Sequence, residues 1–221
     1  MRQRIVLLSG GMDSSLLLLS VVAVEHPGWE IGALAFDYGQ THADAELNAA
    51  TKVCALLNVT LERKTLPDFV GLRAPGSVIP SRNLIFAAIA ANAAQHGEIL
   101  FGFCAEDQAG FPDCRPDFLE RLNQTLALAE LDVTARAPFI RTPKAQIVRL
   151  YAELPQFDEV LALSYSCYFG GEKHCGQCPA CVKRLSALDQ CCPEPTPRLD
   201  PRDGSTTCVA CGTATKAGIY D

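Results

Sequence analysis

The sequence predicts an α/β fold with a doubly wound, mainly parallel sheet. Short apolar runs alternate with helix-compatible segments over residues 1–152. Repeated strand–helix units of this kind place helices on both faces of a parallel sheet. Two glycines follow the first apolar run directly, where such a fold can bind an anion. Eight of the 11 cysteines fall between Cys167 and Cys211, which indicates a cysteine-rich element after the sheet.

The alternating pattern predicts five strands and five helices. The strands are expected at residues 5–8, 31–36, 60–66, 99–104 and 133–137, and the helices at residues 13–24, 43–57, 83–96, 117–128 and 142–152. Pro116 suits a first helical turn, and Thr142 with Pro143 suits a helix start. Glycine, proline and aspartate predict loops over residues 67–80 and 105–115.

Composition narrows the class of protein. The 221 residues carry a formal net charge of −6, and the pI near 5.2 argues against a broad basic face for nucleic acid. No apolar run approaches the ~20 residues that span a bilayer, and no secretory signal is evident. We therefore expect a cytoplasmic protein without a membrane or direct nucleic-acid partner. Its expected parts are a sheet domain (residues 1–160), a metal-binding segment (161–190) and a cysteine-containing tail (191–221).

A glycine loop joins the first predicted strand to the first predicted helix. It consists of Ser9, Gly10, Gly11, Met12, Asp13, Ser14 and Ser15. The glycines let the main chain approach an anion, and the N–H groups at the helix start point at it. The loop lacks the lysine of the Walker motif and the G-x-G-x-x-G spacing. The alternative reading is a plain Gly-Gly turn capped by serine and aspartate.

Four cysteines in the metal-binding segment have the spacing of metal ligands. They are Cys167, Cys175, Cys178 and Cys181. Four thiolates predict a closed, structural Zn²⁺ site, with an iron–sulfur cluster as the rival. His174 adjoins this set and is expected on the surface. Whether a second metal binds to the tail stays open, with the candidate ligands Cys191, Cys192, Cys208 and Cys211. Cys54 and Cys104 are expected to be buried.

These motifs together resemble a known family. S-G-G-x-D-S resembles the pyrophosphate loop of the PP-loop ATP pyrophosphatases, whose fold is adenine nucleotide alpha hydrolase-like. The whole set is similar to the 7-cyano-7-deazaguanine synthase family, in the family's order between Ser9 and Arg184. It comprises F-D-Y-G-Q from Phe36 with His42 and Glu46, P-S-R-N from Pro80, F-P-D-C-R-P from Phe111, A-P-F from Ala137, T-P-K from Thr142 and the four cysteines.

The resemblance implies a ligase that forms carbon–nitrogen bonds. ATP would adenylate the carboxylate of 7-carboxy-7-deazaguanine, ammonia would give an amide and then a nitrile, and the product would serve queuosine biosynthesis. Implied cofactors are ATP, Mg²⁺ and structural Zn²⁺, and a homodimer is implied. The implied catalytic residues are Ser9, Asp13, Ser14 and Lys144. Nucleotide binding is assigned to the glycine loop with Asp37, Tyr38 and Gln40, and substrate binding to Arg82, Asn83, Phe103, Asp113 and Arg115.

Each polar assignment has a structural alternative. Arg82 and Asn83 could simply start a helix, Asp113 could pair with Arg115, and Lys144 could be an exposed helix charge. Two departures from the family, a short connection from Thr65 to Arg82 and the cysteine-containing tail, favour an alternative function. That alternative is a divergent antiphage-defence paralogue that conjugates the activated acid to a protein amine. A non-catalytic zinc module and a tRNA-thiolating enzyme are further hypotheses, and the acidic composition argues against the latter.

Overall fold

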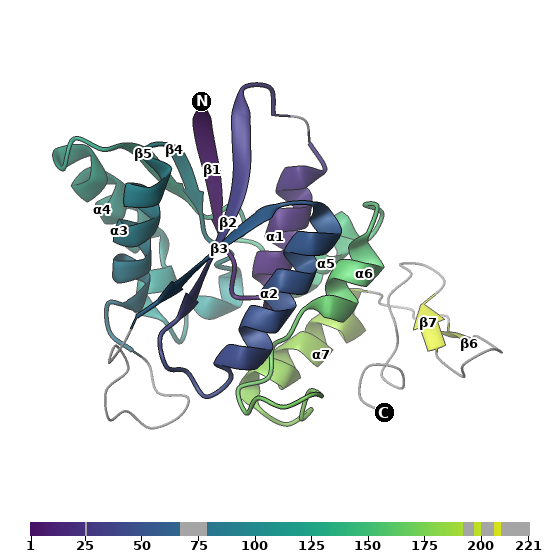
Figure 1. Cartoon of the computed structure of the whole chain (residues 1–221). Helices are drawn as coiled ribbons and strands as arrows, with labels where there is room; N and C mark the ends of the chain where they lie inside the picture. The colour runs from purple at the N-terminus through teal and green to yellow at the C-terminus, as the bar shows by residue number, and fades with distance from the viewer. Residues whose placement is uncertain (25, 67–78, 192–196, 200–205, 209–221) are drawn as a thin grey trace.

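A five-stranded sheet forms the centre of the molecule, and all its neighbouring strands run parallel (Figure 1). The computed structural model describes residues 1–24, 26–66, 79–191, 197–199 and 206–208. The strand order is β3-β2-β1-β4-β5. The strands are β1 (Arg2–Leu7), β2 (Trp29–Asp37), β3 (Thr60–Thr65), β4 (His96–Leu100) and β5 (Asp132–Arg136). The predicted fold class is confirmed.

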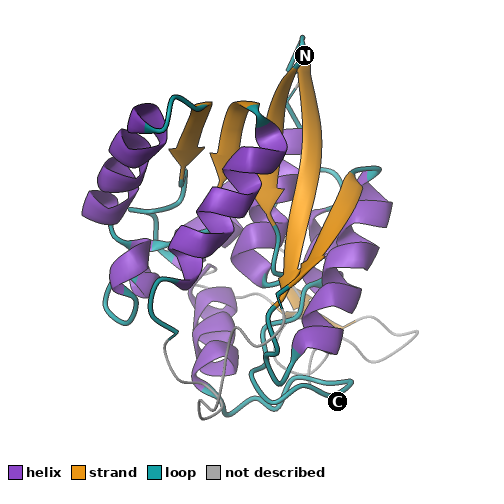
Figure 2. Ribbon diagram, turned by 60° about the vertical axis from the view of Figure 1, so that its left-hand side comes forward, coloured by secondary structure: helices purple, strands orange, loops and turns teal. Residues whose placement is uncertain are grey.

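Helices cover both faces of the sheet (Figure 2). One face packs against α1 (Met12–Val22) and α2 (Ala43–Leu57). On the same side, α5 (Lys144–Tyr151) and α6 (Phe157–Leu163) pack on these helices, and α7 (Pro179–Cys191) packs on α5. The other face packs against α3 (Arg82–Ala94) and α4 (Pro116–Leu128). Among the described helices, none combines the length and the apolar character that a membrane crossing requires.

Alternating side chains of β1 supply both layers of the core. Val6 and Leu8 belong to the core on the α1 side, and Leu7 belongs to the core on the α3 side. Successive residues of a strand point to opposite faces. Because both faces are covered, residues 5–8 are a continuous apolar run rather than an alternation of apolar and polar residues.

The strand order reverses between β1 and β4, which places a crevice at their carboxyl ends. Gly102 follows β4 and lies directly against the start of α1. A Cβ atom there would stand 2.9 Å from both the Cα and the N of Ser14. The chain leaves the sheet at this point, so β4 ends at Leu100 and not at Cys104 as the sequence predicted.

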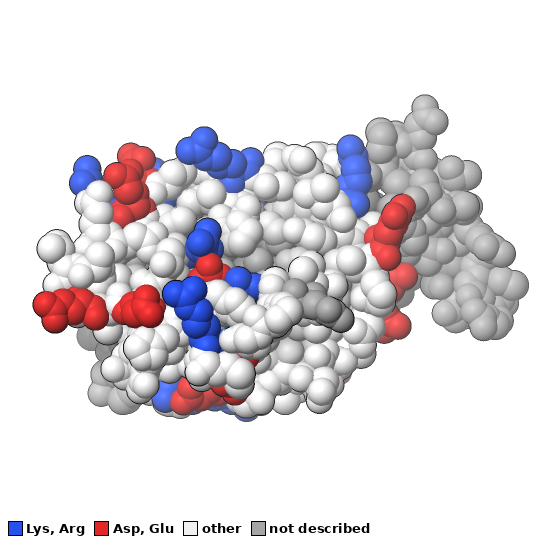
Figure 3. All heavy atoms as spheres, turned by 90° about the horizontal axis from the view of Figure 1, so that it is seen from above, with Lys and Arg blue, Asp and Glu red and all other residues white. Residues whose placement is uncertain are grey.

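The face at the amino ends of the strands shows basic and acidic side chains interspersed (Figure 3). Glu98 lies in β4 and is 9% exposed. Its carboxylate accepts from Arg4 Nη2 at 2.7 Å and from Arg136 Nε at 2.6 Å. The cluster links three adjacent strands, so these two arginines have a structural partner.

Several elements were not predicted. The sequence pattern did not predict helices α6 and α7, and α6 spans only seven residues. The loop predicted at residues 105–115 contains the 3₁₀ turns η1 (Ala105–Asp107) and η2 (Pro112–Cys114). In the tail, the short strands β6 (Pro197–Leu199) and β7 (Thr206–Cys208) pair antiparallel. Residues 67–78 of the predicted loop, together with Cys192 and Cys211, lie outside the described residues, as do the side chains of Cys191 and Cys208.

The metal-binding segment packs onto the sheet domain. Helix α7 lies against α5, and the buried Arg184 donates to Ser164 Oγ at 2.8 Å and to Leu161 O at 2.7 Å. These contacts give the segment a shared core with the preceding residues. The boundaries at residues 160 and 190 stay predictions.

Candidate functional site

A cavity of about 340 Å³ lies at the carboxyl ends of β1, β2 and β4. It is lined by residues of the glycine loop, the end of β2, the start of α3, the loop after β4 and Tyr168. Nine of the predicted site residues line it, namely Ser9, Gly11, Asp13, Ser14, Tyr38, Gln40, Arg82, Asn83 and Phe103. The topology thus brings together residues that were predicted as catalytic, as nucleotide-binding and as substrate-binding.

The glycine loop is held tightly between α2 and the metal-binding segment. Gly10 has a φ of +76°, and its carbonyl accepts from Tyr165 N at 2.8 Å. Gly11 precedes α1 as its N-cap, and its N–H donates to Ser9 Oγ at 3.2 Å. Ser9 Oγ and Ser14 Oγ are 3.1 Å apart. These contacts hold the loop in a conformation in which Ser9 and Ser14 line the cavity.

Gly10→Ala is expected to destabilise the fold more than Gly28→Ala. The two glycines share a left-handed φ, +76° and +82°, which costs a non-glycine residue roughly 1–3 kcal/mol. At Gly10 a Cβ would also stand 2.4 Å from Glu46 O, whereas at Gly28 nothing lies within 4 Å. We expect an additional 1–3 kcal/mol, roughly, for Gly10→Ala alone. Urea unfolding of both variants measures the difference, and equal losses would contradict the packing of Gly10 on α2.

Two other loop residues point away from the cavity. Met12 is 3% exposed and packs in the core, so its side chain does not line the cavity. Ser15 is fully buried, and its hydroxyl has no hydrogen-bond partner among the described residues. Only the main chain of these two residues remains for contact with an anion.

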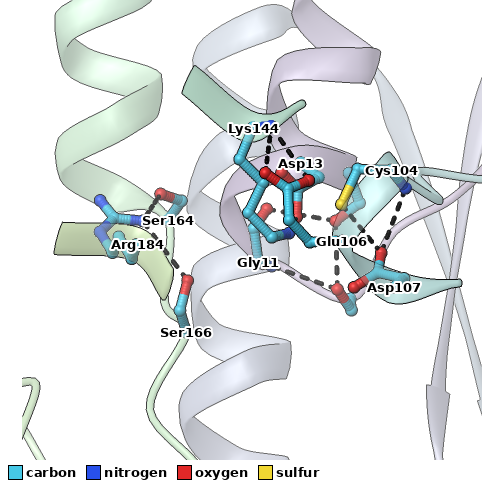
Figure 4. Close-up of polar contacts among 11 residues, drawn as sticks. Gly11, Asp13, Cys104, Glu106, Asp107, Lys144, Ser164, Ser166 and Arg184 are labelled. Carbon is cyan, nitrogen blue, oxygen red and sulfur yellow. Dashed lines mark hydrogen bonds and ion pairs between the residues drawn. The ribbon is translucent and has the colours of Figure 1, made fainter. Parts of the chain in front are cut away.

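Lys144 forms a buried ion pair with Asp13 (Figure 4). The side chains are 10% and 17% exposed, respectively. Burial alone would lower the pKa of Lys144, but the charges of Asp13 and Asp107 outweigh burial, so the pKa is raised. The ammonium therefore stays charged beside the glycine loop. This burial contradicts the alternative that Lys144 is an exposed helix charge.

The start of α5 is held by a residue that the sequence did not indicate. Thr142 was predicted as the N-cap, but the helix begins at Lys144, and Thr142 O instead accepts from Ala105 N at 3.1 Å. Glu106 Oε1 and Oε2 accept from Lys144 N at 2.9 and 3.2 Å. A carboxylate at the N-terminal end of a helix also interacts favourably with the helix dipole.

Asp107 was missed as a site residue. It lines the cavity, and its carboxylate, that of Asp13 and Cys104 Sγ lie within 4.8 Å of one another. Cys104 donates to Asp107 Oδ2 from N at 3.1 Å and from Sγ at 3.2 Å. Burial raises the pKa of the Cys104 thiol, which stays protonated. The one signal in the sequence was its place in the predicted loop at residues 105–115, directly after a predicted strand.

Aromatic rings form one wall of the cavity. The rings of Phe36 and Phe86 stack with centroids 4.0 Å apart, and those of Phe101 and Phe103 with centroids 4.6 Å apart. Arg82 Nη1 donates to Tyr38 Oη at 3.2 Å. An apolar wall with one cation suits a flat ring that carries polar or anionic groups.

The remaining predicted residues hold the turns around the cavity. Asp113 Oδ2 accepts from Asn83 N at 3.2 Å at the start of α3. Arg115 Nε donates to Gln108 O at 3.0 Å. In these contacts Asp113 and Arg115 do not pair with each other, as the structural alternative would require. Asp37 Oδ1 accepts from Gly39 N at 3.1 Å. None of Asp37, Asp113 and Arg115 lines the cavity among the described residues.

The four cysteines predicted as metal ligands come together. One ligand atom of each, in Cys167, Cys175, Cys178 and Cys181, lies within 4.8 Å of the others. The N–H groups of Gln177 and Cys178 donate to Cys175 Sγ at 3.4 and 3.3 Å and lower its pKa to about 6. Thiolates in a closed set of four fit a soft metal such as zinc or iron. Cys54 and Cys104 are buried as expected.

His174 does not join the cysteines. Its Nε2 accepts from Ser166 N at 3.1 Å, and its ring lies 5.0 Å from that of Tyr165. The ring is half-buried, so the expectation of a surface residue was wrong. Burial and the charge of Arg184 lower the pKa of His174 to about 4. The neutral ring supports the main chain beside Cys167.

The cysteine cluster and the cavity share a wall. Tyr165 N donates to Gly10 O, and Thr41 Oγ1 donates to Tyr168 O at 3.2 Å. Cys167 lies between these two tyrosines in the sequence, and Tyr168 lines the cavity. The segment that carries the first cysteine is therefore bonded to the glycine loop and to the loop before α2.

Known proteins match this chain over most of its length. The family model described as queuosine biosynthesis protein QueC matches residues 3–72 and 67–192. The 7-cyano-7-deazaguanine synthase of Oceanobacillus iheyensis is 33% identical over 215 residues, covering 86% of this chain and 94% of that protein. The synthase of Acetivibrio thermocellus is 35% identical over 219 residues, with the same coverage.

A solved structure has a similar fold. The U34-tRNA thiolase NcsA from Methanococcus maripaludis, with its [4Fe-4S] cluster, matches with a TM-score of 0.54. The match covers 84% of this chain and 64% of that chain at 16% identity. At this identity the likeness concerns the fold alone.

Proposed function

Because the chain belongs to the family of queuosine biosynthesis protein QueC, we propose that it activates the carboxylate of 7-carboxy-7-deazaguanine with ATP and converts it to an amide and then to a nitrile. One observation carries the proposal. Residues of the glycine loop, Asp13 among them, and an aromatic wall with Arg82 line one cavity at the switch point of the sheet, and Lys144 pairs with Asp13 from outside that lining. Such a site can bind a nucleotide and a flat acid side by side.

The glycine loop and Lys144 bind the pyrophosphate portion of ATP. The hydroxyl groups of Ser9 and Ser14 and the N–H groups at the start of α1 donate to its oxygens. The ammonium of Lys144 neutralises the charge that develops as pyrophosphate leaves. Asp13 and Asp107 offer carboxylate oxygens for Mg²⁺, which when bound would neutralise the triphosphate. Asp37, Tyr38 and Gln40 form the turn on which the nucleoside rests.

The aromatic wall binds the deazaguanine ring. Phe103 contributes a ring face, and Phe111 and Tyr168 also line the cavity. Arg82 and Asn83 supply donors for the carboxylate or for the guanine-like edge. Asp113 and Arg115 hold the loops that carry these groups.

Two activations give the nitrile. In the first, the carboxylate attacks the α-phosphorus, pyrophosphate leaves, and ammonia displaces AMP to form the amide. In the second, the amide oxygen attacks another ATP, and loss of AMP with the two N–H protons forms the C≡N bond.

The four cysteines hold a structural Zn²⁺ in this proposal. Four thiolate ligands leave no position for a reacting group, so the metal would supply stability and not chemistry. The cytoplasmic location, the homodimer and a second metal in the tail stay predictions.

Mass spectrometry after incubation with ATP, Mg²⁺, the acid and ammonium tests the function. We expect the nitrile as product. Two AMP and two pyrophosphate should form for each nitrile, and only when the acid is present. Absence of acid-dependent AMP from metal-replete protein would refute the proposal. The mass of the acyl group attached to protein, in place of the nitrile, would favour conjugation to a protein amine. The two pieces of the family-model match overlap at residues 67–72, within the short connection that motivates this alternative.

A further inference from the structure

We propose that His42 accepts the proton from the attacking amine and that Glu46 positions its ring. The inference rests on the proposed function, since it assigns residues to the amine step of that reaction. Both side chains line the cavity that contains the glycine loop. They are 13% and 18% exposed, and His42 Nε2 lies 3.4 Å from Glu46 Oε1.

The pair lies directly beside the glycine loop. Glu46 O is the atom that a Cβ on Gly10 would meet at 2.4 Å, so the first turn of α2 packs against that loop. His42 immediately precedes α2. The pair is therefore adjacent to the place where the acyl adenylate forms, on the side that leads to Tyr168.

Neighbouring side chains hold this pair in a defined orientation. Gln40 Nε2 donates to Glu46 Oε2 at 3.1 Å and to Phe36 O at 3.2 Å. On the other side of the ring, His42 Nδ1 and Thr41 Oγ1 are 3.4 Å apart. The ring of Tyr168 lies 5.7 Å from that of His42. An imidazole held in this way between a carboxylate and a hydroxyl group is oriented to accept a proton and pass it on.

Other groups of the cavity wall are less suited to this task. Asp13 is paired with Lys144, and Asp107 accepts two hydrogen bonds from Cys104. Burial raises the pKa of Tyr38, and it raises that of Cys114 to about 12, so both stay protonated at neutral pH. Burial likewise raises the pKa of Tyr168. Among the described residues that line the cavity, His42 is the only imidazole.

The amine step needs such an acceptor. The lone pair of ammonia forms the C–N bond, the bond between the acyl carbon and the AMP oxygen breaks, and AMP leaves with that electron pair. The nitrogen then carries one proton more than the amide does, and this proton goes to the imidazole and afterwards to solvent. No oxidant or reductant is involved. The adenylation step, in contrast, requires no proton acceptor.

The variant His42→Asn is expected to slow the amine step and to leave the adenylation step almost unchanged. Without ammonium, we expect acid-dependent exchange of pyrophosphate into ATP to stay within about twofold of the unaltered protein. With ammonium, we expect amide formation to slow by about a hundredfold or more. The deficit should shrink as pH rises, because hydroxide can take the proton in place of the imidazole, and it should be smaller with hydroxylamine, because the nitrogen of its adduct is more acidic and loses its proton to water more readily. Glu46→Gln should show the same pattern with a smaller loss.

His96→Asn is the matched control. His96 Nδ1 lies 3.4 Å from Asp132 Oδ2, but these side chains are 67% and 66% exposed and lie outside the cavity. This variant should leave both half-reactions unchanged. An unchanged amide rate in His42→Asn, or an equal loss of exchange and amide formation in His42→Asn and His42→Gln, would overturn the inference. Absence of acid-dependent exchange in the unaltered protein would instead refute the proposed function.

Discussion

Lys144→Met is expected to reduce acid-dependent pyrophosphate release by about a hundredfold to a thousandfold, the usual loss when one electrostatic contact to a developing anion is removed. It should also destabilise the fold by roughly 3 kcal/mol, because it leaves Asp13 as a buried carboxylate without its cation. Both side chains are more than four-fifths buried, so solvent screens the pair only weakly. Urea unfolding and a pyrophosphate assay measure the two effects separately.

A double variant distinguishes the structural role of Lys144 from its catalytic role. Asp13→Asn combined with Lys144→Met removes both charges, and most of the lost stability should return. Activity should stay as low as in the single variant, because the cation is still missing. Lys64→Met is the control. Its pair with Glu62 is exposed, 39% and 52%, and such pairs contribute about 1 kcal/mol or less. Full turnover by Lys144→Met would contradict the assigned role.

Removal of the metal is expected to have the second large effect. Elemental analysis should find one zinc per cysteine cluster, and Cys178→Ser should lose it, since Cys178 is 3% exposed within the set of four sulfur ligands. Structural zinc sites contribute directly to the free energy of folding. A loss of about 4 kcal/mol would lower the midpoint of thermal unfolding by roughly 10 °C in a chain of this size.

The metal-free protein should also bind ATP more weakly. Tyr165 N donates to Gly10 O, so disorder beside Cys167 would release the glycine loop. Titration calorimetry with an ATP analogue measures this coupling. Cys54→Ala is the control, because it removes a buried thiol from the helical core and leaves the four ligands intact. Unchanged metal content in Cys178→Ser would contradict the site, and bound iron with visible absorption would identify an iron–sulfur cluster instead.

Not every side-chain role could be predicted from local pattern. Thr142 has the residue type and place of an N-cap, yet Glu106 supplies the contact to α5 from 38 residues earlier in the chain. Asp113 and Arg115 resembled substrate-binding residues, and the structure places both in hydrogen bonds that hold loops. Asp107 gains significance only from its neighbours, and His42 was part of a sequence motif that did not indicate its contact with Glu46. A motif identifies candidate residues, but packing decides which of them face the cavity.

The sequence by itself determined the features that depend on near neighbours along the chain. The alternation of strands and helices, the glycine loop at residues 9–15 and the spacing of Cys175, Cys178 and Cys181 are all of this kind, because backbone geometry links residues a few positions apart. Only the tertiary structure decided that Lys144 meets Asp13, 131 residues away, and that the segment at Cys167 closes onto Gly10. Such contacts arise from how parallel strands are ordered in the sheet, and that order is a property of the packed core rather than of any local segment.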